Sequence, residues 1–155
     1  GIPLPENFNH PYMATSVTDL WRRWHMTLAG WLRDYIYYPL LFALMRMTKA
    51  STKGGKALLS AAAIFITFAI CGVWHGETYG MLFFGISSGL VLAIETVVLA
   101  RSAAKANAQP TAPDATVDPV RQICMRLLTM NVAMITFGPV LLTNDQCIKL
   151  VKMIF

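Results

Sequence analysis

Charged residues are scarce in this sequence, and acidic ones are the scarcest. Only 14% of the 155 residues are charged, with 8 Asp or Glu against 13 Lys or Arg. Mean hydropathy is +0.50, which is unusual for a soluble domain. Cysteine is rare as well. Cys71, Cys124 and Cys147 are odd in number and scattered, which argues against both a disulfide framework and a C-x-x-C zinc site.

Long uncharged runs are what the sequence has instead. Three segments, residues 57–74, 78–100 and 127–144, approach the length of about 17 to 25 residues that a helix needs to cross a bilayer, although the uncharged part of the second ends at residue 94. We therefore predict an all-α, polytopic transmembrane protein with about three spanning helices. A shorter uncharged run at residues 35–45 belongs to the class of interfacial, re-entrant or buried segments.

The basic residues are grouped around these spans, so we predict a lipid bilayer as partner and no nucleic acid. Of the 13 basic residues, 11 precede the first span or lie between the second and third, and Lys149 and Lys152 follow the third. Residues 75–79 carry a single acidic residue. Under the positive-inside rule, residues 46–56 and 101–126 face the cytoplasm and His75 lies toward the opposite side. Residues 101–121, rich in Ala, Pro, Thr and Asp, are expected to be a flexible cytoplasmic loop.

The N-terminal part is expected to be an approach loop at residues 1–16, followed by an amphipathic or re-entrant helical region at residues 17–46. Ser16 and Asp19 fit a capping box, so a helix should begin near Val17. Aromatic residues and arginines then segregate to two sides of that helix. The chain begins with Gly-Ile-Pro rather than Met, and three helices with polar faces need partners to bury them. We therefore expect a piece of a longer protein, with earlier transmembrane helices as partners.

Two histidines lie in the hydrophobic region, His25 and His75, and each directly follows a tryptophan. An ionisable group at membrane depth usually faces a cavity or a partner, because lipid cannot solvate it. In an apolar, water-poor pocket a histidine stays neutral and can accept a proton from a hydroxyl nucleophile. Gly72 and Gly76 would let a substrate approach closely. The alternative is that both histidines are structural. Without a third ligand in the pattern, they predict no metal site.

Two stretches together resemble the membrane-bound O-acyltransferase family: PENFNHPYMATSVTDLWRRWHMTLAGWLRDYIYYPL at residues 5–40 and GVWHG at residues 72–76. The similarity is to the bacterial branch that contains alginate O-acetyltransferase and the D-alanyl transfer protein of lipoteichoic acid D-alanylation. It implies that residues 1–155 are roughly the C-terminal third of a single membrane domain of that type.

The resemblance also implies roles for individual residues. His75 matches the catalytic histidine of the family, and His25 matches its second motif histidine. The substrate tunnel would be shaped by Trp24 and Trp74, beside the two glycines, Gly72 and Gly76. Four charged residues would support the helix or contact the donor at the cytoplasmic mouth of the tunnel: Arg22, Arg23, Arg33 and Asp34.

The implied chemistry is transfer of an acyl group, D-alanyl or acetyl, from a thioester donor to a hydroxyl of an extracytoplasmic envelope polymer or polysaccharide. The donor would be a phosphopantetheine carrier protein or acyl-coenzyme A, acting as substrate on the cytoplasmic side, and no bound cofactor is expected. The enzyme would be a multi-pass protein of the bacterial cytoplasmic (inner) membrane. The alternative is a non-catalytic conduit or carrier-protein docking subunit. A histidine-relay transporter is disfavoured because the spans hold no further charge pair.

Overall fold

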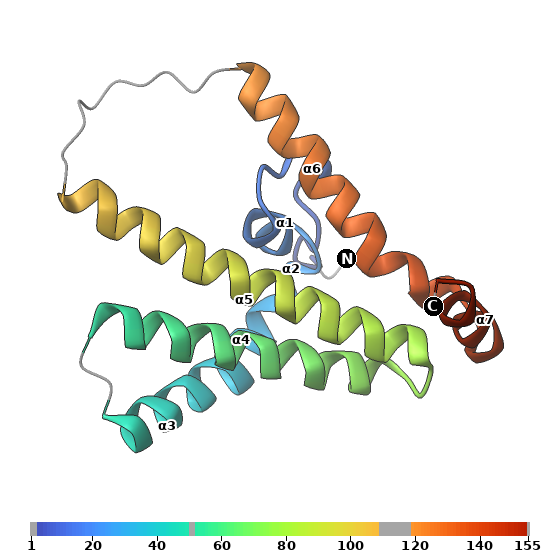
Figure 1. The fold of residues 1–155 in the computed structure, drawn as a ribbon, viewed down its shortest axis with the longest axis horizontal. Helices are drawn as coiled ribbons and strands as arrows, with labels where there is room; N and C mark the ends of the chain where they lie inside the picture. Colours follow the sequence, from blue (N-terminus) through green and yellow to red (C-terminus); the bar gives the residue numbers. More distant parts are fainter. Residues whose placement is uncertain (1–2, 50–51, 109–118, 155) are drawn as a thin grey trace.

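The computed structural model describes residues 3–49, 52–108 and 119–154, and in these ranges all regular structure is helical, as predicted (Figure 1). The helices are α1 (Val17–Arg23), α2 (Met26–Leu32), α3 (Tyr38–Thr48), α4 (Lys53–His75), α5 (Tyr79–Ala108), α6 (Pro119–Phe137) and α7 (Asn144–Ile154). Shorter pieces are the 3-10 turns Pro11–Met13 and Gly138–Leu141 and a π-helical turn, Arg33–Tyr37, between α2 and α3.

Three helices of the described chain are long and apolar enough to cross a membrane, which confirms the predicted number. They are Lys53–His75, Tyr79–Lys105 and Pro119–Leu141. The third differs from the predicted residues 127–144, because α6 begins earlier and gives way to a 3-10 turn at Gly138. Pro139 has no N–H to continue the α-helical ladder. The predicted span began too late because the first turns of α6 contain arginines, which an uncharged window excludes. A long basic side chain can nevertheless reach the membrane interface from within a span.

The boundaries predicted for a loop at residues 101–121 are wrong at both ends. α5 continues to Ala108, and α6 already begins at Pro119. The extension of α5 runs through an alanine-rich sequence, and alanine has the highest helix propensity. Proline at the start of α6 is also favourable, because the first amide of a helix has no intrahelical partner. Residues 109–118 lie outside the described part of the chain.

The region at residues 17–46 is helical but it is not one straight helix. α1 begins at Val17 as predicted, and the Ser16 hydroxyl accepts a hydrogen bond from Asp19 N at 3.0 Å. The helix then ends at Arg23, because Trp24 is extended, φ −112° and ψ 128°, and His25 adopts left-handed backbone angles, φ 46° and ψ 50°. That conformation does not continue a right-handed helix. The chain turns a corner there and resumes as α2.

α4 and α5 run antiparallel and side by side (Figure 1), and glycines bring their backbones into contact. Gly72 of α4 lies against Gly85 of α5, and Gly89 lies one turn further along α5, against the backbone of Phe65. Small residues at a helix interface within a membrane let two backbones approach closely. α1 and α6 both pack against α5 of this helix pair, and α1 also reaches α4 through Trp21 and Phe68.

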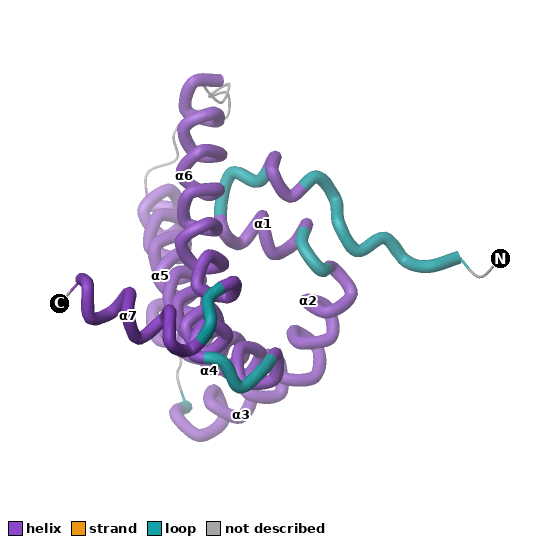
Figure 2. The backbone as a smooth tube through the Cα atoms, turned by 90° about the vertical axis from the view of Figure 1, so that its right-hand side faces the viewer, coloured by secondary structure: helices purple, strands orange, loops and turns teal. Residues whose placement is uncertain are grey.

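An aromatic cluster, made of Trp21, Phe68, Phe84 and Phe137, joins α1 to the three spanning helices. Trp21 of α1 stacks on Phe137 of α6 with ring centroids 5.8 Å apart and meets Phe68 of α4 at 4.7 Å. Phe84 of α5 lies 4.8 Å from Phe137. Beyond this cluster the chain leaves α6, and α7 turns away from its axis (Figure 2).

Candidate active site

The turn between α1 and α2 is held by the segment that precedes α1. The side-chain Oδ1 of Asn7 accepts hydrogen bonds from Thr27 N at 3.1 Å and from Thr27 Oγ1 at 2.7 Å. The carbonyl oxygen of Asn7 accepts another from Met26 N at 2.9 Å. These amides belong to the first turn of α2, where they have no partner within the helix. The predicted approach loop therefore caps the N-terminus of α2.

His25 stands in this turn with an uncommon backbone conformation. Left-handed angles are rare for a residue with a Cβ atom, and such positions cluster at functional sites. The half-buried His25 ring lies 4.9 Å from the Phe8 ring and 5.9 Å from the Trp24 ring, measured between centroids. Phe8 also meets Trp24 edge-on at 5.0 Å. The imidazole is thus positioned by its own backbone and by two aromatic neighbours.

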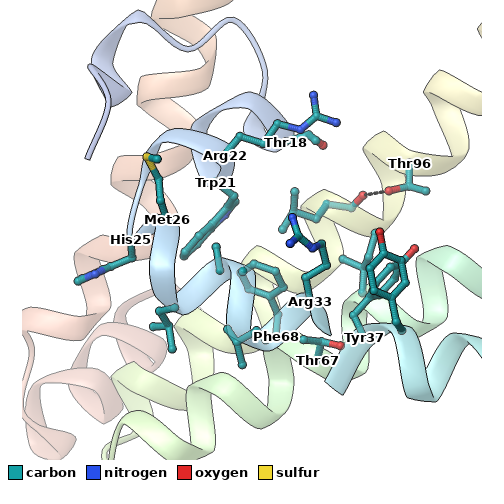
Figure 3. Close-up of a pocket in the computed structure, with 17 residues that line it drawn as sticks. Thr18, Trp21, Arg22, His25, Met26, Arg33, Tyr37, Thr67, Phe68 and Thr96 are labelled. Atoms are coloured by element: carbon teal, nitrogen blue, oxygen red, sulfur yellow. Dashed lines mark hydrogen bonds between the residues drawn. The ribbon is translucent and has the colours of Figure 1, made fainter. Parts of the chain in front are cut away.

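A cavity of about 600 Å³ lies beside His25, lined by residues of α1, α2, the π-helical turn, α3, α4 and α5. Figure 3 shows His25 and Met26 at one end and Tyr37 at the other, with Trp21 and Arg33 between them. Most of the wall is apolar, and its aliphatic and aromatic part includes Leu28, Leu32, Ile64, Phe68 and Leu92. A pocket of this size, with a mostly apolar wall and polar side chains set into it, is typical of a ligand site.

Two arginines reach the cavity wall, Arg22 from α1 and Arg33 from the π-helical turn. Arg33 Nε and Nη2 donate to the carboxylate oxygens of Asp34 at 2.8 and 3.3 Å. This hydrogen bond raises the pKa of Arg33 and lowers the pKa of Asp34. Arg23 instead supports α1, since its Nε donates to Asp19 Oδ1 at 2.9 Å. Arg22 makes no ion pair in the described ranges, so its guanidinium is available to an anionic group.

His75 is the last residue of α4 and is not among the residues that line this cavity. Its ring lies 4.8 Å from the Trp74 ring and 6.2 Å from the Phe84 ring, between centroids. Phe84 belongs to the aromatic cluster, which also contains Trp21 on the cavity wall. The side chain of His75 is exposed. The water-poor pocket expected around it is therefore not formed by the described residues alone.

The residues predicted to shape a tunnel are dispersed. Gly72 is used for packing between α4 and α5. Trp74 is 67% exposed and faces a groove on the outer side of these two helices, away from the cavity lining. Gly76 ends α4. Trp24 packs on His25 and, at 5.8 Å, on Phe137 without lining the cavity.

Two residues that position α1 and α2 were assigned no role from the sequence, Asn7, which lies within the family-like stretch at residues 5–40, and Glu95. Glu95 of α5 accepts two hydrogen bonds from Thr18 of α1. The available signal was an acidic residue inside an otherwise uncharged span, which usually pairs with a partner. Among the described residues no group of three or more His, Cys, Asp or Glu is arranged to hold a metal ion.

Three named bacterial proteins are similar to this chain. A relative described as "Probable alginate O-acetylase AlgI" from Pseudomonas syringae is 38% identical over 98 residues, which is 63% of this chain and 17% of the relative. Teichoic acid D-alanyltransferase of Bacillus subtilis is 35% identical over 92 residues, 59% of this chain and 22% of the relative. Peptidoglycan O-acetyltransferase of Helicobacter pylori is 36% identical over 97 residues, 61% of this chain and 16% of the relative.

The chain thus spans about a fifth of the length of the curated relatives it matches. With three helices able to span a bilayer, it is part of a multi-pass membrane protein. The model of the membrane-bound O-acyltransferase family matches residues 1–137, which is more than half of the chain. The chain belongs to the membrane-bound O-acyltransferase family.

Proposed function

We propose that this chain is the histidine-bearing part of a bacterial O-acyltransferase that modifies the cell envelope. The acyl group, D-alanyl or acetyl, passes from a thioester to a hydroxyl of an extracytoplasmic polymer. The donor is a phosphopantetheine carrier protein or acyl-coenzyme A. Relatives named for O-acetylation and for D-alanylation match the chain at similar identity, so both acyl groups stay within the proposal.

One observation carries the proposal: a largely apolar cavity with His25 at one end also has two arginines on its wall, in a chain of this family. Apolar walls suit the extended arm of a thioester, and guanidinium groups suit the anionic part of its carrier. Arg22 and Arg33 are the groups that would bind that anion. His75 lies beyond the aromatic cluster, where the acceptor would approach.

In the proposed reaction His75 acts as general base and touches the acceptor hydroxyl. Its neutral imidazole takes the hydroxyl proton as the oxygen attacks the thioester carbonyl. The carbon–oxygen bond forms, the carbon–sulfur bond breaks, and the proton passes from the imidazolium to the departing thiolate. His25 orients the reactants at the cavity. The donor is reached from the cytoplasm and the acceptor from outside, in the cytoplasmic membrane.

Replacement of His75 in the full-length protein tests this function. His75→Ala should lower acyl transfer about a hundredfold or more, the usual contribution of a general base, with membrane insertion unchanged. His10→Ala is the matched control, because His10 is an exposed loop histidine whose ring contacts Tyr12 alone among the described residues. Its transfer rate should equal that of the wild type. Full transfer by His75→Ala would contradict the assignment.

A second candidate function is a non-catalytic conduit or docking subunit for the carrier protein. The observation that favours it is the exposure of His75, which the described residues do not enclose in a pocket. It predicts that His75→Ala still supports modification of the polymer. It also predicts that Arg22→Gln and Arg33→Gln reduce only the binding of the donor. The maximal rate of transfer in His75→Ala therefore distinguishes the two functions: it falls for the enzyme and is unchanged for the docking subunit.

A further inference from the structure

A carboxylate from a membrane-spanning helix holds the start of α1. Glu95 Oε2 accepts a hydrogen bond from the backbone amide of Thr18 at 2.7 Å and another from the Thr18 hydroxyl at 2.8 Å. The two residues are 77 positions apart, so this contact joins α5 directly to the N-terminal region. Glu95 is the one acidic residue in the sequence of α5, and it is half-buried.

The amide of Thr18 needs such a partner. The first amides of a helix have no intrahelical acceptor, and α1 begins one residue earlier at Val17. Ser16 Oγ satisfies the amide of Asp19 at 3.0 Å, which leaves the amide of Thr18 to Glu95. A carboxylate at a helix N-terminus is also favoured by the helix dipole, and its bonds to amide donors are short and strong.

The position of α1 decides the shape of the cavity wall. Thr18, Trp21 and Arg22 of α1 all line the cavity, and His25 follows the end of the helix. α1 has seven residues, so at about 1.5 Å per residue the whole helix is only about 10 Å long. A shift of its N-terminus is therefore transmitted to every one of these groups.

We propose that Glu95 is a positioning residue for acyl transfer: it anchors α1 to α5 and so sets the place of Trp21, Arg22 and His25 on the donor cavity. The role of Glu95 in acyl transfer rests on the function proposed above, whereas its anchoring of α1 through the hydrogen bonds to Thr18 does not. Glu95 works as a hydrogen-bond acceptor and exchanges no proton with the substrate. An amide oxygen can therefore replace it.

The test uses the full-length protein with Glu95→Ala and Glu95→Gln, and reads both amide exchange and acyl transfer. Glu95→Ala should speed hydrogen–deuterium exchange in peptides that cover residues 17–25 and leave peptides from α4 unchanged. The same variant should lower kcat/KM about tenfold or more, because small misplacements of reacting groups are costly. Glu95→Gln should stay within about threefold of wild type, since its amide oxygen still accepts.

Two controls sharpen the reading. Asp145→Ala removes an exposed carboxylate on α7 and should change neither exchange in residues 17–25 nor transfer. Thr18→Val removes the hydroxyl donor and keeps the backbone one. In a Glu95→Ala background it should add little further amide exchange in residues 17–25, since residues that act through one contact are not additive.

Three results would overturn the positioning role. Equal loss of transfer in Glu95→Gln and Glu95→Ala would mean that the charge or the proton of Glu95 matters. Unchanged exchange in Glu95→Ala would mean that the anchor is absent. Faster exchange with unchanged transfer would mean that the place of α1 does not affect the reaction. If the wild type itself transfers no acyl group, the proposed function and the reaction that Glu95 serves both fall, while faster exchange would still establish the anchor.

Discussion

Gly72 of α4 and Gly85 of α5 meet at backbone distance. A Cβ atom built on Gly72 would lie 2.8 Å from Gly85 Cα and 2.7 Å from the carbonyl oxygen of Met81. Both neighbours are backbone atoms, which cannot rotate aside as a flexible side chain can. Gly72 lies in the last turn of α4, which ends at His75. Phe84, the residue before Gly85 in α5, contacts the His75 ring. The packing of two glycines therefore sets where the candidate catalytic histidine stands.

Alanine at Gly72 should consequently separate α4 from α5. We expect Gly72→Ala to destabilise the protein by about 1 to 3 kcal/mol, the usual cost of overpacking, and to reduce acyl transfer through displacement of His75. Thermal unfolding of the purified protein measures the first effect. Gly54→Ala is the control, because a Cβ there meets nothing within 4 Å. That variant should be neutral or slightly stabilised, and equal melting temperatures for the two variants would contradict the packing argument.

Loss of the Asn7 side chain should loosen the turn that carries His25. Asn7→Ala removes the acceptor of two hydrogen bonds from Thr27, and loss of a helix cap costs about 1 kcal/mol. We expect a lower melting temperature and a lower maximal rate of transfer. Glu6→Ala, at an exposed neighbouring position, should change neither. A melting temperature of Asn7→Ala equal to that of wild type would mean that the N-terminal segment does not hold the turn.

Release of Arg33 from Asp34 should strengthen donor binding. Asp34 competes with an anionic donor for the Arg33 guanidinium, so Asp34→Asn should lower the KM for the donor and Arg33→Gln should raise it. The sign of the pH dependence follows from the pKa of Asp34, which its hydrogen bond with Arg33 lowers. The carboxylate is charged above its pKa, and the pairing is lost only as pH falls through that pKa.

The ratio of KM values between wild type and Asp34→Asn should accordingly stay constant from about pH 5 to 8, well above the ordinary carboxyl pKa of about 3.9. Steady-state kinetics across this range measures it. Asp145→Asn, on exposed α7, should leave KM unchanged at every pH. A ratio that falls toward one between pH 8 and pH 5 would show that Asp34 titrates there, contrary to the lowered pKa.

Several elements could be predicted from the sequence because they depend on local properties. A long apolar run without charge partitions into lipid, so the sequence predicts three spans, which the structure confirms. Ser16 and Asp19 form a local capping motif, which correctly predicted that α1 begins at Val17. The motifs around His25 and His75 were sufficient to predict the family. The end of α5 was missed because the hydrophobic criterion does not detect a polar, alanine-rich continuation of a helix.

The arrangement of the candidate site depended instead on contacts between residues far apart in the chain. The bond from Thr18 to Glu95 and the contact of Gly72 with Gly85 follow from the path of the backbone, which no local pattern specifies. The family resemblance implied that Trp74 and Gly72 shape a tunnel, and that role stays a prediction. In the described chain Trp74 is exposed and Gly72 packs against α5.

By itself, then, the sequence determined that this is a helical membrane chain with two motif histidines, because hydrophobicity and motif spacing are properties of the chain alone. Only the tertiary structure decided that His25 adjoins the cavity and that His75 lies beyond an aromatic cluster. Only it revealed that a carboxylate of α5 caps α1. These relations require helices to pack at particular distances, and packing is settled by which side chains fit together in space.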